Sequence, residues 1–253
     1  REGAEVVLGP TLRKLATAAT FNPSLPYLSF LCINFDAPVV KEAASWFLGG
    51  VFLNYNSSYL ERALEQMLDE ADSPEVTRFL RAVDVRIDGF RVEKAPEGRG
   101  QRVFVKHEVD GKGYELRLSE ESAGTQKLMG LAAFLLAALE RGGTVVVDEL
   151  DAKLHPKLLR YVILLFKDPE VNKHGAQLIF SSQDVSTMRN DVFRRDEIWF
   201  AARGEGEASQ LWSLADIHET NGNLVSKNAA FDKQYLSGRY GADPYLTRIE
   251  EWN

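Results

Sequence analysis

The chain has 253 residues, of which 45% are hydrophobic and 26% are charged, so it is long enough for one large domain or two small ones. The 30 lysine and arginine residues against 37 aspartate and glutamate residues give a net charge of −7. This balance excludes an overall basic nucleic-acid-binding surface and leaves only a local patch open. The single cysteine, Cys32, excludes a disulfide framework and a cysteine-rich zinc site, and it fits the reducing cytoplasm. No uninterrupted apolar stretch approaches the roughly 18 residues of a membrane-spanning helix, so we expect no membrane association of that kind.

The first 82 residues form a mixed, partly helical segment. Two apolar runs, Tyr27–Ile33 and Trp46–Leu53, have no clean period. Over residues 57–69 apolar side chains recur at helical spacing and predict a helix. Ser73, Pro74 and Glu75 are typical of a helix start, which predicts a second short helix that ends near Ala82.

The segment 83–118 changes to a period of two. Apolar residues alternate with polar ones in three short runs, which predicts a small antiparallel β meander. Asp110-Gly111 has the composition of a tight hairpin turn.

The segment 119–253 alternates helices with strands, which predicts an α/β fold with a partly parallel sheet and helical cover. A very apolar helix is expected over 124–140, and Gly142-Gly143 suits its C-terminal cap. The further elements expected here are a buried strand over 144–147, a helix over 156–166, a buried strand over 177–181, and strands over 197–201 and 210–214.

Two adjacent carboxylates, Asp148 and Glu149, follow the predicted strand 144–147. In an α/β sheet, ligands bind outside the carboxyl ends of the strands. A carboxylate there can hold Mg²⁺, and the next one can polarise an attacking water. Taken alone, this pattern is more often a strand that simply ends in polar residues.

Two other polar segments belong to the same region. Ser122–Gln126 begins the apolar helix with small residues, and exposed backbone N–H groups at a helix N-terminus favour a phosphate. Taken alone, this segment is more often an ordinary serine-capped helix. The strand 177–181 ends in Ser182-Gln183-Asp184, at the same edge of the predicted sheet. Several polar loops in this order are a much stronger signal than any one of them.

Together these motifs resemble ABC-type ATPases. Ser122–Gln126 resembles the signature motif, Val145–Glu149 the Walker B strand with its catalytic glutamate, and Leu150–Pro156 the D-loop in its LD-x-x-LHP form. That form is typical of prokaryotic ATPases related to SMC, RecF and the overcoming-lysogenisation-defect proteins, including stand-alone members of anti-phage and abortive-infection operons. The resemblance is specific from about Leu118 to Pro244.

The resemblance implies an ABC-ATPase-like head that uses ATP and Mg²⁺. Asp148 would hold Mg²⁺, and Glu149 would orient or deprotonate the hydrolytic water. Ser122 and Gly124 would contact the γ-phosphate of a nucleotide bound mainly by a second subunit.

The resemblance also assigns Gln126 to nucleotide binding, and Asp151 would support the contact between subunits. ATP binding and dimerisation would therefore be coupled. The implied function is a nucleotide-gated homodimer that senses infection or restrains an effector nuclease or toxin.

The sequence departs from the family pattern in two places. It contains no G-x-x-x-x-G-K-[ST] phosphate-binding loop, so we expect that loop in an N-terminal lobe that precedes Arg1. Gln183 stands where the family usually has a histidine before the aspartate. Glutamine can donate a hydrogen bond to a γ-phosphate but cannot carry the same proton, which favours slow hydrolysis or an ATP-held switch.

Two alternatives stay open. Asp148 and Asp151 form a D-x-x-D pattern that a Toprim-like nuclease could use to bind metal ions. With Gln183, the domain could also be a head that does not hydrolyse ATP and serves only dimerisation and partner binding. The sequence leaves nucleic-acid binding open.

Overall fold

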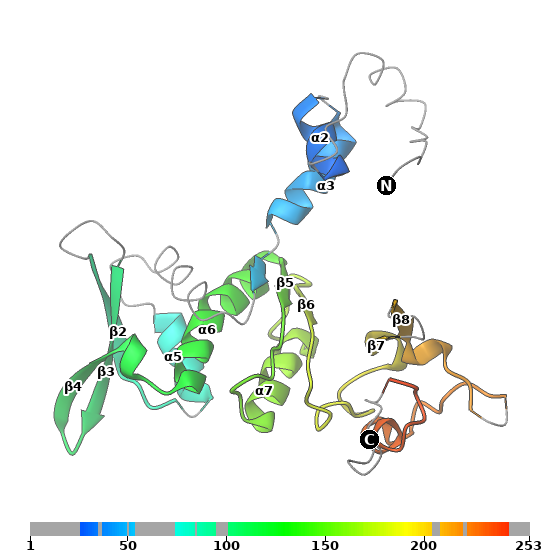
Figure 1. Cartoon of the computed structure of the whole chain (residues 1–253). Coiled ribbons are helices and arrows are strands. Elements are labelled where there is room, and N and C mark those ends of the chain that lie inside the picture. The colour runs from blue at the N-terminus through cyan, green and yellow to red at the C-terminus, as the bar shows by residue number, and fades with distance from the viewer. Residues whose placement is uncertain are drawn as a thin grey trace, which may run out of the picture. The chain divides into compact units, whose positions relative to one another are not determined.

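The structure is a computed structural model that describes residues 26–34, 37–49, 51–53, 74–83, 85–94, 101–203, 208–219 and 222–242 (Figure 1). Internal contacts divide the chain into two units, 1–51 and 52–253. The helix predicted over 57–69 lies outside the described residues, and so does the N-cap position Ser73. Within the described ranges, no helix has the length and hydropathy needed to cross a membrane.

The first unit contains two short helices, α2 (Tyr27–Asn34) and α3 (Pro38–Gly49). Its buried residues are Phe30, Leu31, Ala37 and Val40, with Leu28 and Cys32 packed against them. The sequence did not predict these helices, because apolar residues occur on all sides of α2 and give no amphipathic period.

The second unit contains a helix that packs beside a three-stranded antiparallel sheet. Helix α5 (Pro74–Ala82) begins at the predicted proline and buries Val76, Phe79 and Leu80. The strands are β2 (Gly89–Lys94), β3 (Gln101–Val109) and β4 (Lys112–Arg117). The predicted meander is therefore confirmed.

The hairpin turn between β3 and β4 is also confirmed. Val109 pairs with Lys112, which leaves Asp110 and Gly111 as a two-residue loop. Both have a positive φ, +51° and +71°, as a type I′ turn requires, and this turn matches the twist of the strands it joins.

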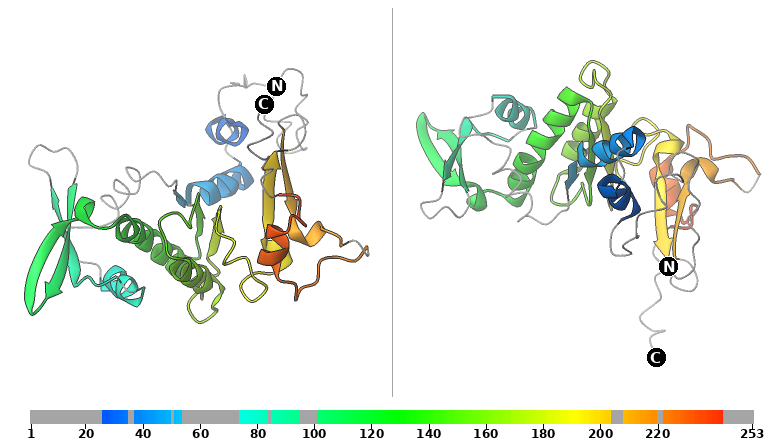
Figure 2. Two further views of the ribbon diagram at one scale, coloured as in Figure 1. Left: turned by 60° about the horizontal axis from the view of Figure 1, so that its bottom comes forward. Right: turned by 90° about the horizontal axis from the view of Figure 1, so that it is seen from above.

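The long helix α6 (Ala123–Arg141) begins and ends where the sequence predicts. Ser122 caps its N-terminus, and Gly142 with φ +76° caps its C-terminus. The helix is buried over most of its circumference, and it packs beside α5 and β5 (Figures 1 and 2).

A small sheet with the strand order β1–β5–β6 positions the site. Its strands are β1 (Val51–Leu53), β5 (Thr144–Val147) and β6 (Gln177–Phe180), and α7 (Pro156–Lys167) connects β5 to β6. Strands β5 and β6 are parallel and lie side by side in Figure 1, so the predicted α/β class with a partly parallel sheet is confirmed.

One prediction about this sheet is wrong: β6 is not a buried strand. Gln177 is exposed, and Ile179 is 52% exposed, whereas Val145 and Val147 of β5 are fully covered. Strand β6 is exposed because it lies at the edge of the described sheet, whereas β5 is covered because it lies in the middle.

The C-terminal part forms a hairpin with its own core. Strands β7 (Trp199–Arg203) and β8 (Ser209–Ser213) are antiparallel, and α8 (Phe231–Leu236) follows. Phe200, Leu214 and Phe231 are central to the core. The first strand begins two residues later than predicted, because Arg195–Glu197 form a turn of 3₁₀ helix.

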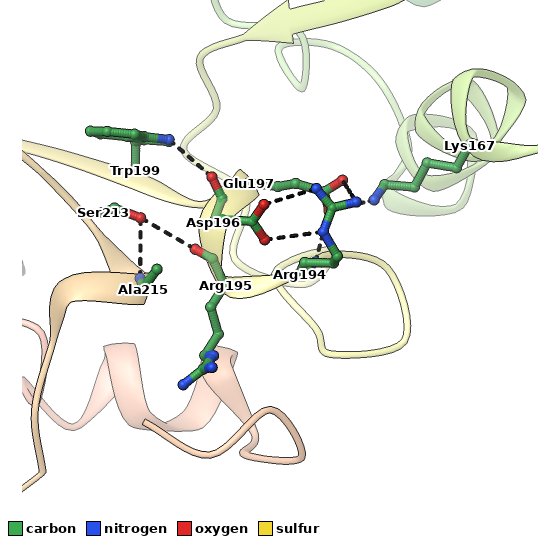
Figure 3. A network of polar contacts seen from close by, with 8 residues as sticks. All are labelled: Lys167, Arg194, Arg195, Asp196, Glu197, Trp199, Ser213 and Ala215. Atoms are coloured by element: carbon green, nitrogen blue, oxygen red, sulfur yellow. Dashed lines mark hydrogen bonds and ion pairs between the residues drawn. The ribbon is translucent and has the colours of Figure 1, made fainter. Parts of the chain in front are cut away.

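A polar network joins α7 to this hairpin (Figure 3). Lys167 Nζ on α7 donates to Glu197 Oε2 at 2.6 Å, and the Arg194 amide donates to the same oxygen at 2.7 Å. Burial would raise the pKa of the Glu197 carboxyl, but these two hydrogen bonds and the positive charges of Lys167 and Arg194 together outweigh burial, so the pKa is lowered. Trp199 Nε1 adds a hydrogen bond to the carbonyl oxygen of Asp196 at 3.2 Å.

We expect Leu135→Ala in α6 to destabilise the protein by about 2–5 kcal/mol, because the side chain is fully buried and its removal leaves a cavity. Leu236→Ala is the matched control, since Leu236 is 69% exposed and its loss should change stability by less than about 0.5 kcal/mol. Urea denaturation of both variants measures the difference. Equal losses of stability in the two variants would show that Leu135 of α6 is not part of the core.

Candidate functional site

The candidate site lies where the start of α6 and the carboxyl ends of β5 and β6 converge. Val147 pairs with Phe180, so the residues that follow the two strands leave the sheet side by side. The structure therefore brings the acidic pair 148–149 to the same edge of the sheet as the polar segment 182–184, as the sequence predicts.

Ser181 connects the two carboxylate residues of the pair. Its hydroxyl donates to Asp148 Oδ1, and the Glu149 amide donates to the same hydroxyl oxygen at 2.7 Å. The amide of Leu150 donates to the Ser181 carbonyl oxygen at 3.0 Å. The sequence interpretation missed this serine, and the only signal for it was a hydroxyl at the end of a strand.

The turn after β5 has an unusual backbone. Glu149 and Lys153 have positive φ values of +51° and +61°, which cost about 1–3 kcal/mol each in a residue other than glycine. The Ala152 amide donates to the Glu149 carbonyl oxygen at 3.1 Å, and the fully buried Leu150 side chain fixes the turn against the core. Strain of this kind is typical of functional sites, so the turn is a candidate for catalysis.

Asp151 faces the loop after β6. The Gln183 amide donates to Asp151 Oδ2 at 3.2 Å, and Oδ1 is shielded from solvent without a hydrogen-bond partner among the described residues. The Gln183 residue is exposed at the same loop. Asp151 therefore fixes the position of Gln183 within one chain.

The start of α6 is capped by Ser122. Ser122 Oγ accepts from the Thr125 amide at 3.1 Å and lies 2.9 Å from Thr125 Oγ1. Gln126 Nε2 donates to the Glu121 carbonyl oxygen at 2.7 Å, so this amide stabilises the chain just before the helix. The first amides of a helix of this length favour an anion, as predicted for a phosphate.

Gly124 brings the helix into close contact with the turn after β5, here called the D-loop turn because the sequence predicts a D-loop over 150–156. A Cβ atom at this position would lie 2.9 Å from the carbonyl oxygen of Lys153, closer than a side chain tolerates. Only glycine permits this approach. Gly124 therefore allows the predicted signature segment, 122–126, to contact the predicted D-loop, 150–156.

Lys127 is a site residue that the sequence interpretation missed. It is only 4% exposed, and its ammonium group donates to the carbonyl oxygens of Glu149 at 2.6 Å and Ala152 at 2.9 Å. Burial lowers the pKa of Lys127 to about 8, against the opposing effect of the Asp151 and Glu149 carboxylates. The sequence pattern that could have identified it is a lysine within a helix of mostly apolar residues.

His107 of β3 joins the meander to the residue before the helix cap. Its Nε2 lies 2.6 Å from Glu121 Oε1, and its Nδ1 lies 2.9 Å from the Arg86 carbonyl oxygen. Both partners are acceptors, so both ring nitrogens donate in the imidazolium form. Burial opposes this form, but the two hydrogen bonds and the negative charges of Glu121 and Asp88 together outweigh it, so the pKa of His107 is raised.

The chemistry of Asp148 fits a magnesium ion. Asp148 is exposed, and Ser181 engages one carboxylate oxygen, Oδ1. Mg²⁺ usually binds one or two carboxylates together with substrate phosphates and water, so Asp148 alone is sufficient. In the part of the chain that the structure describes, no three His, Cys, Asp or Glu side chains form a metal-binding group.

The comparison with family models identifies the family. A model described as "AAA domain, putative AbiEii toxin, Type IV TA system" matches residues 17–189, which is more than half of the chain. The chain belongs to this family of AAA domains. The match includes every residue that the sequence predicts for the site, and it confirms the resemblance to ATPases of abortive-infection systems.

Solved structures similar to this AAA domain come from SMC proteins. One, from work on ATP-driven dimerisation of SMC ATPases, has 17% identity and a TM-score of 0.36 and covers 62% of this chain and 84% of its own. The Smc head of Pyrococcus yayanosii has 18% identity and a TM-score of 0.36, with coverages of 73% and 29%. The Smc head of Pyrococcus furiosus, bound to a ScpA domain, has 16% identity and a TM-score of 0.37, with coverages of 74% and 44%.

This chain therefore spans less than half the length of the two Pyrococcus chains. The comparison with curated proteins gave no match.

We expect Gly124→Ala to destabilise the AAA domain by about 1–3 kcal/mol, because the new methyl group forces α6 and the D-loop turn apart. Gly113→Ala is the matched control, since a Cβ atom there meets nothing within 4 Å. Chemical denaturation of the two variants compares them. A Gly124→Ala protein as stable as the control would contradict the close contact.

The His107–Glu121 pair makes stability depend on pH. The folded pKa of His107 is raised above its ordinary 6.5, so its contribution is fully present below pH 6.5 and is lost as the pH rises through the folded pKa. In the His107→Gln variant, folding stability should fall less steeply as the pH rises. The measurement is the midpoint of urea denaturation at a series of pH values. The exposed His174 provides the control, and His174→Gln should keep the wild-type slope.

Proposed function

We propose that this AAA domain is the signature and Walker B half of an ATPase that hydrolyses ATP to ADP and phosphate. The observation that carries the proposal is the arrangement of Asp148 and Glu149 around the Ser181 hydroxyl at the carboxyl end of a central strand. The family match supports the same activity. A P-loop, which this sequence does not contain, would complete the site.

In this proposal each residue has one task. Asp148 binds the magnesium ion, and Glu149 orients the attacking water and accepts its proton. The exposed Gln183 donates a hydrogen bond to the γ-phosphate. When it is bound, Mg²⁺ neutralises the phosphate charge that develops during transfer.

The start of α6 is our candidate for the contact with a second nucleotide. Ser122, Gly124 and the helix amides form an anion-binding end, which we assign to the γ-phosphate of a nucleotide held by a second copy of the chain. Gln126 supports this end through the Glu121 carbonyl oxygen. ATP would thus hold two heads together, and hydrolysis would release them.

We further propose a role in phage defence, as a sensor or regulator of an effector nuclease or toxin in the cytoplasm. The family description, which names a putative AbiEii toxin of a Type IV TA system, fits such a role. A non-hydrolysing head remains the second candidate, because Gln183 lacks the proton chemistry of a histidine. The Toprim-like nuclease gains no support from the geometry, because Asp148 and Asp151 contact different residues, Ser181 and Gln183.

Glu149→Gln in the full-length protein should lower kcat for ATP hydrolysis by about 100-fold or more, because the general base is lost. ATP-dependent dimerisation, measured by light scattering with Mg²⁺, should persist. Glu140→Gln, at an exposed position near the end of α6, is the control and should hydrolyse ATP normally. A wild-type protein with ATP-dependent dimers but no hydrolysis would support the second candidate. The absence of both would contradict the ATPase.

A further inference from the structure

Lys127 carries a charged group into an apolar part of the protein. Its neighbours in the helix, Leu128 and Met129, are also buried and are apolar. Taking a charge out of water is expensive unless hydrogen bonds compensate, and the ammonium group makes them to the carbonyl oxygens of Glu149 and Ala152. The specific contribution of this lysine is therefore its contact with the turn that carries Glu149.

Lys127 acts on the backbone of Glu149. The carbonyl oxygen of Glu149 accepts from Lys127 Nζ at 2.6 Å, and the amide of Glu149 donates to Ser181 Oγ at 2.7 Å. The two peptide groups on either side of a residue with φ +51° are thus held by separate side chains. Because rotation of either peptide would swing the Cα–Cβ bond, these two contacts set the direction of the Glu149 side chain.

The same ammonium group connects this turn to the start of α6. It also donates to the Ala152 carbonyl oxygen at 2.9 Å, and Gly124 approaches the next carbonyl, that of Lys153. Both contacts originate within the first turns of α6, close to Ser122. A displacement of the helix start therefore displaces the backbone that carries Glu149.

We propose that Lys127 is a positioning residue for ATP hydrolysis: it holds the Glu149 peptide so that the carboxylate meets the attacking water, and it links this peptide to the phosphate-binding start of α6. The inference rests on the proposed ATPase function. It goes beyond that function by assigning a task to a residue that does not itself touch the nucleotide.

The test compares Lys127→Met with wild type in the full-length protein. We expect kcat to fall about 100-fold, the loss typical of a misplaced catalytic group, while KM and the binding of a fluorescent ATP analogue stay within about twofold. Lys173→Met, which changes an exposed lysine before β6, is the matched control and should leave both constants unchanged.

A double-mutant cycle separates positioning from a merely structural role. If Lys127 acts through Glu149, the double variant Lys127→Met with Glu149→Gln should hydrolyse ATP no more slowly than Glu149→Gln alone. If the two substitutions lower kcat independently, so that their fold-decreases multiply in the double variant, the proposal is overturned. A Lys127→Met protein that keeps kcat, or one that loses nucleotide binding together with its folded structure, would also overturn it. A wild type without hydrolysis would instead refute the ATPase function itself, before any variant is compared.

Discussion

The parallel hydrogen bonds between β5 and β6 bring together two polar segments that are more than thirty residues apart in the chain. Ser181, at the end of one strand, then contacts both members of the acidic pair at the end of the other. The loop that follows continues the contact from Gln183 to Asp151. If this pairing shifted by one residue, the side chains would point to the opposite face of the sheet and the site would not form.

The site concentrates features that cost stability. Glu149 and Lys153 have left-handed backbone conformations, and Lys127 carries an ammonium group into the interior. The surrounding packing offsets these costs through the buried Leu150 and the apolar faces of α6 and β5. Such a combination of strain and buried charge is typical of functional sites, where the geometry of the residues matters more than stability.

Two other contacts connect the site to the rest of the second unit. On the side of the meander, His107 binds Glu121, the residue before the cap of α6. On the side of the C-terminal hairpin, Lys167 at the end of α7 binds Glu197. Each link is an ion pair between segments that belong to different local structures. These charged contacts therefore join the elements that carry the site to the structure on both sides of it.

The sequence by itself determined the features that depend on neighbouring residues. The cap at Ser122, the left-handed Gly142, the hairpin at Asp110-Gly111 and the acidic pair after β5 follow from local backbone preferences and from hydrophobic period. Tertiary structure alone decided which long-range partners meet: Lys127 with the Glu149 carbonyl, Gly124 with Lys153, and Ser181 with Asp148. It also decided that β6 is exposed, contrary to its apolar sequence. A side chain's burial and its distant partner depend on which elements pack against it, and no local pattern contains that information.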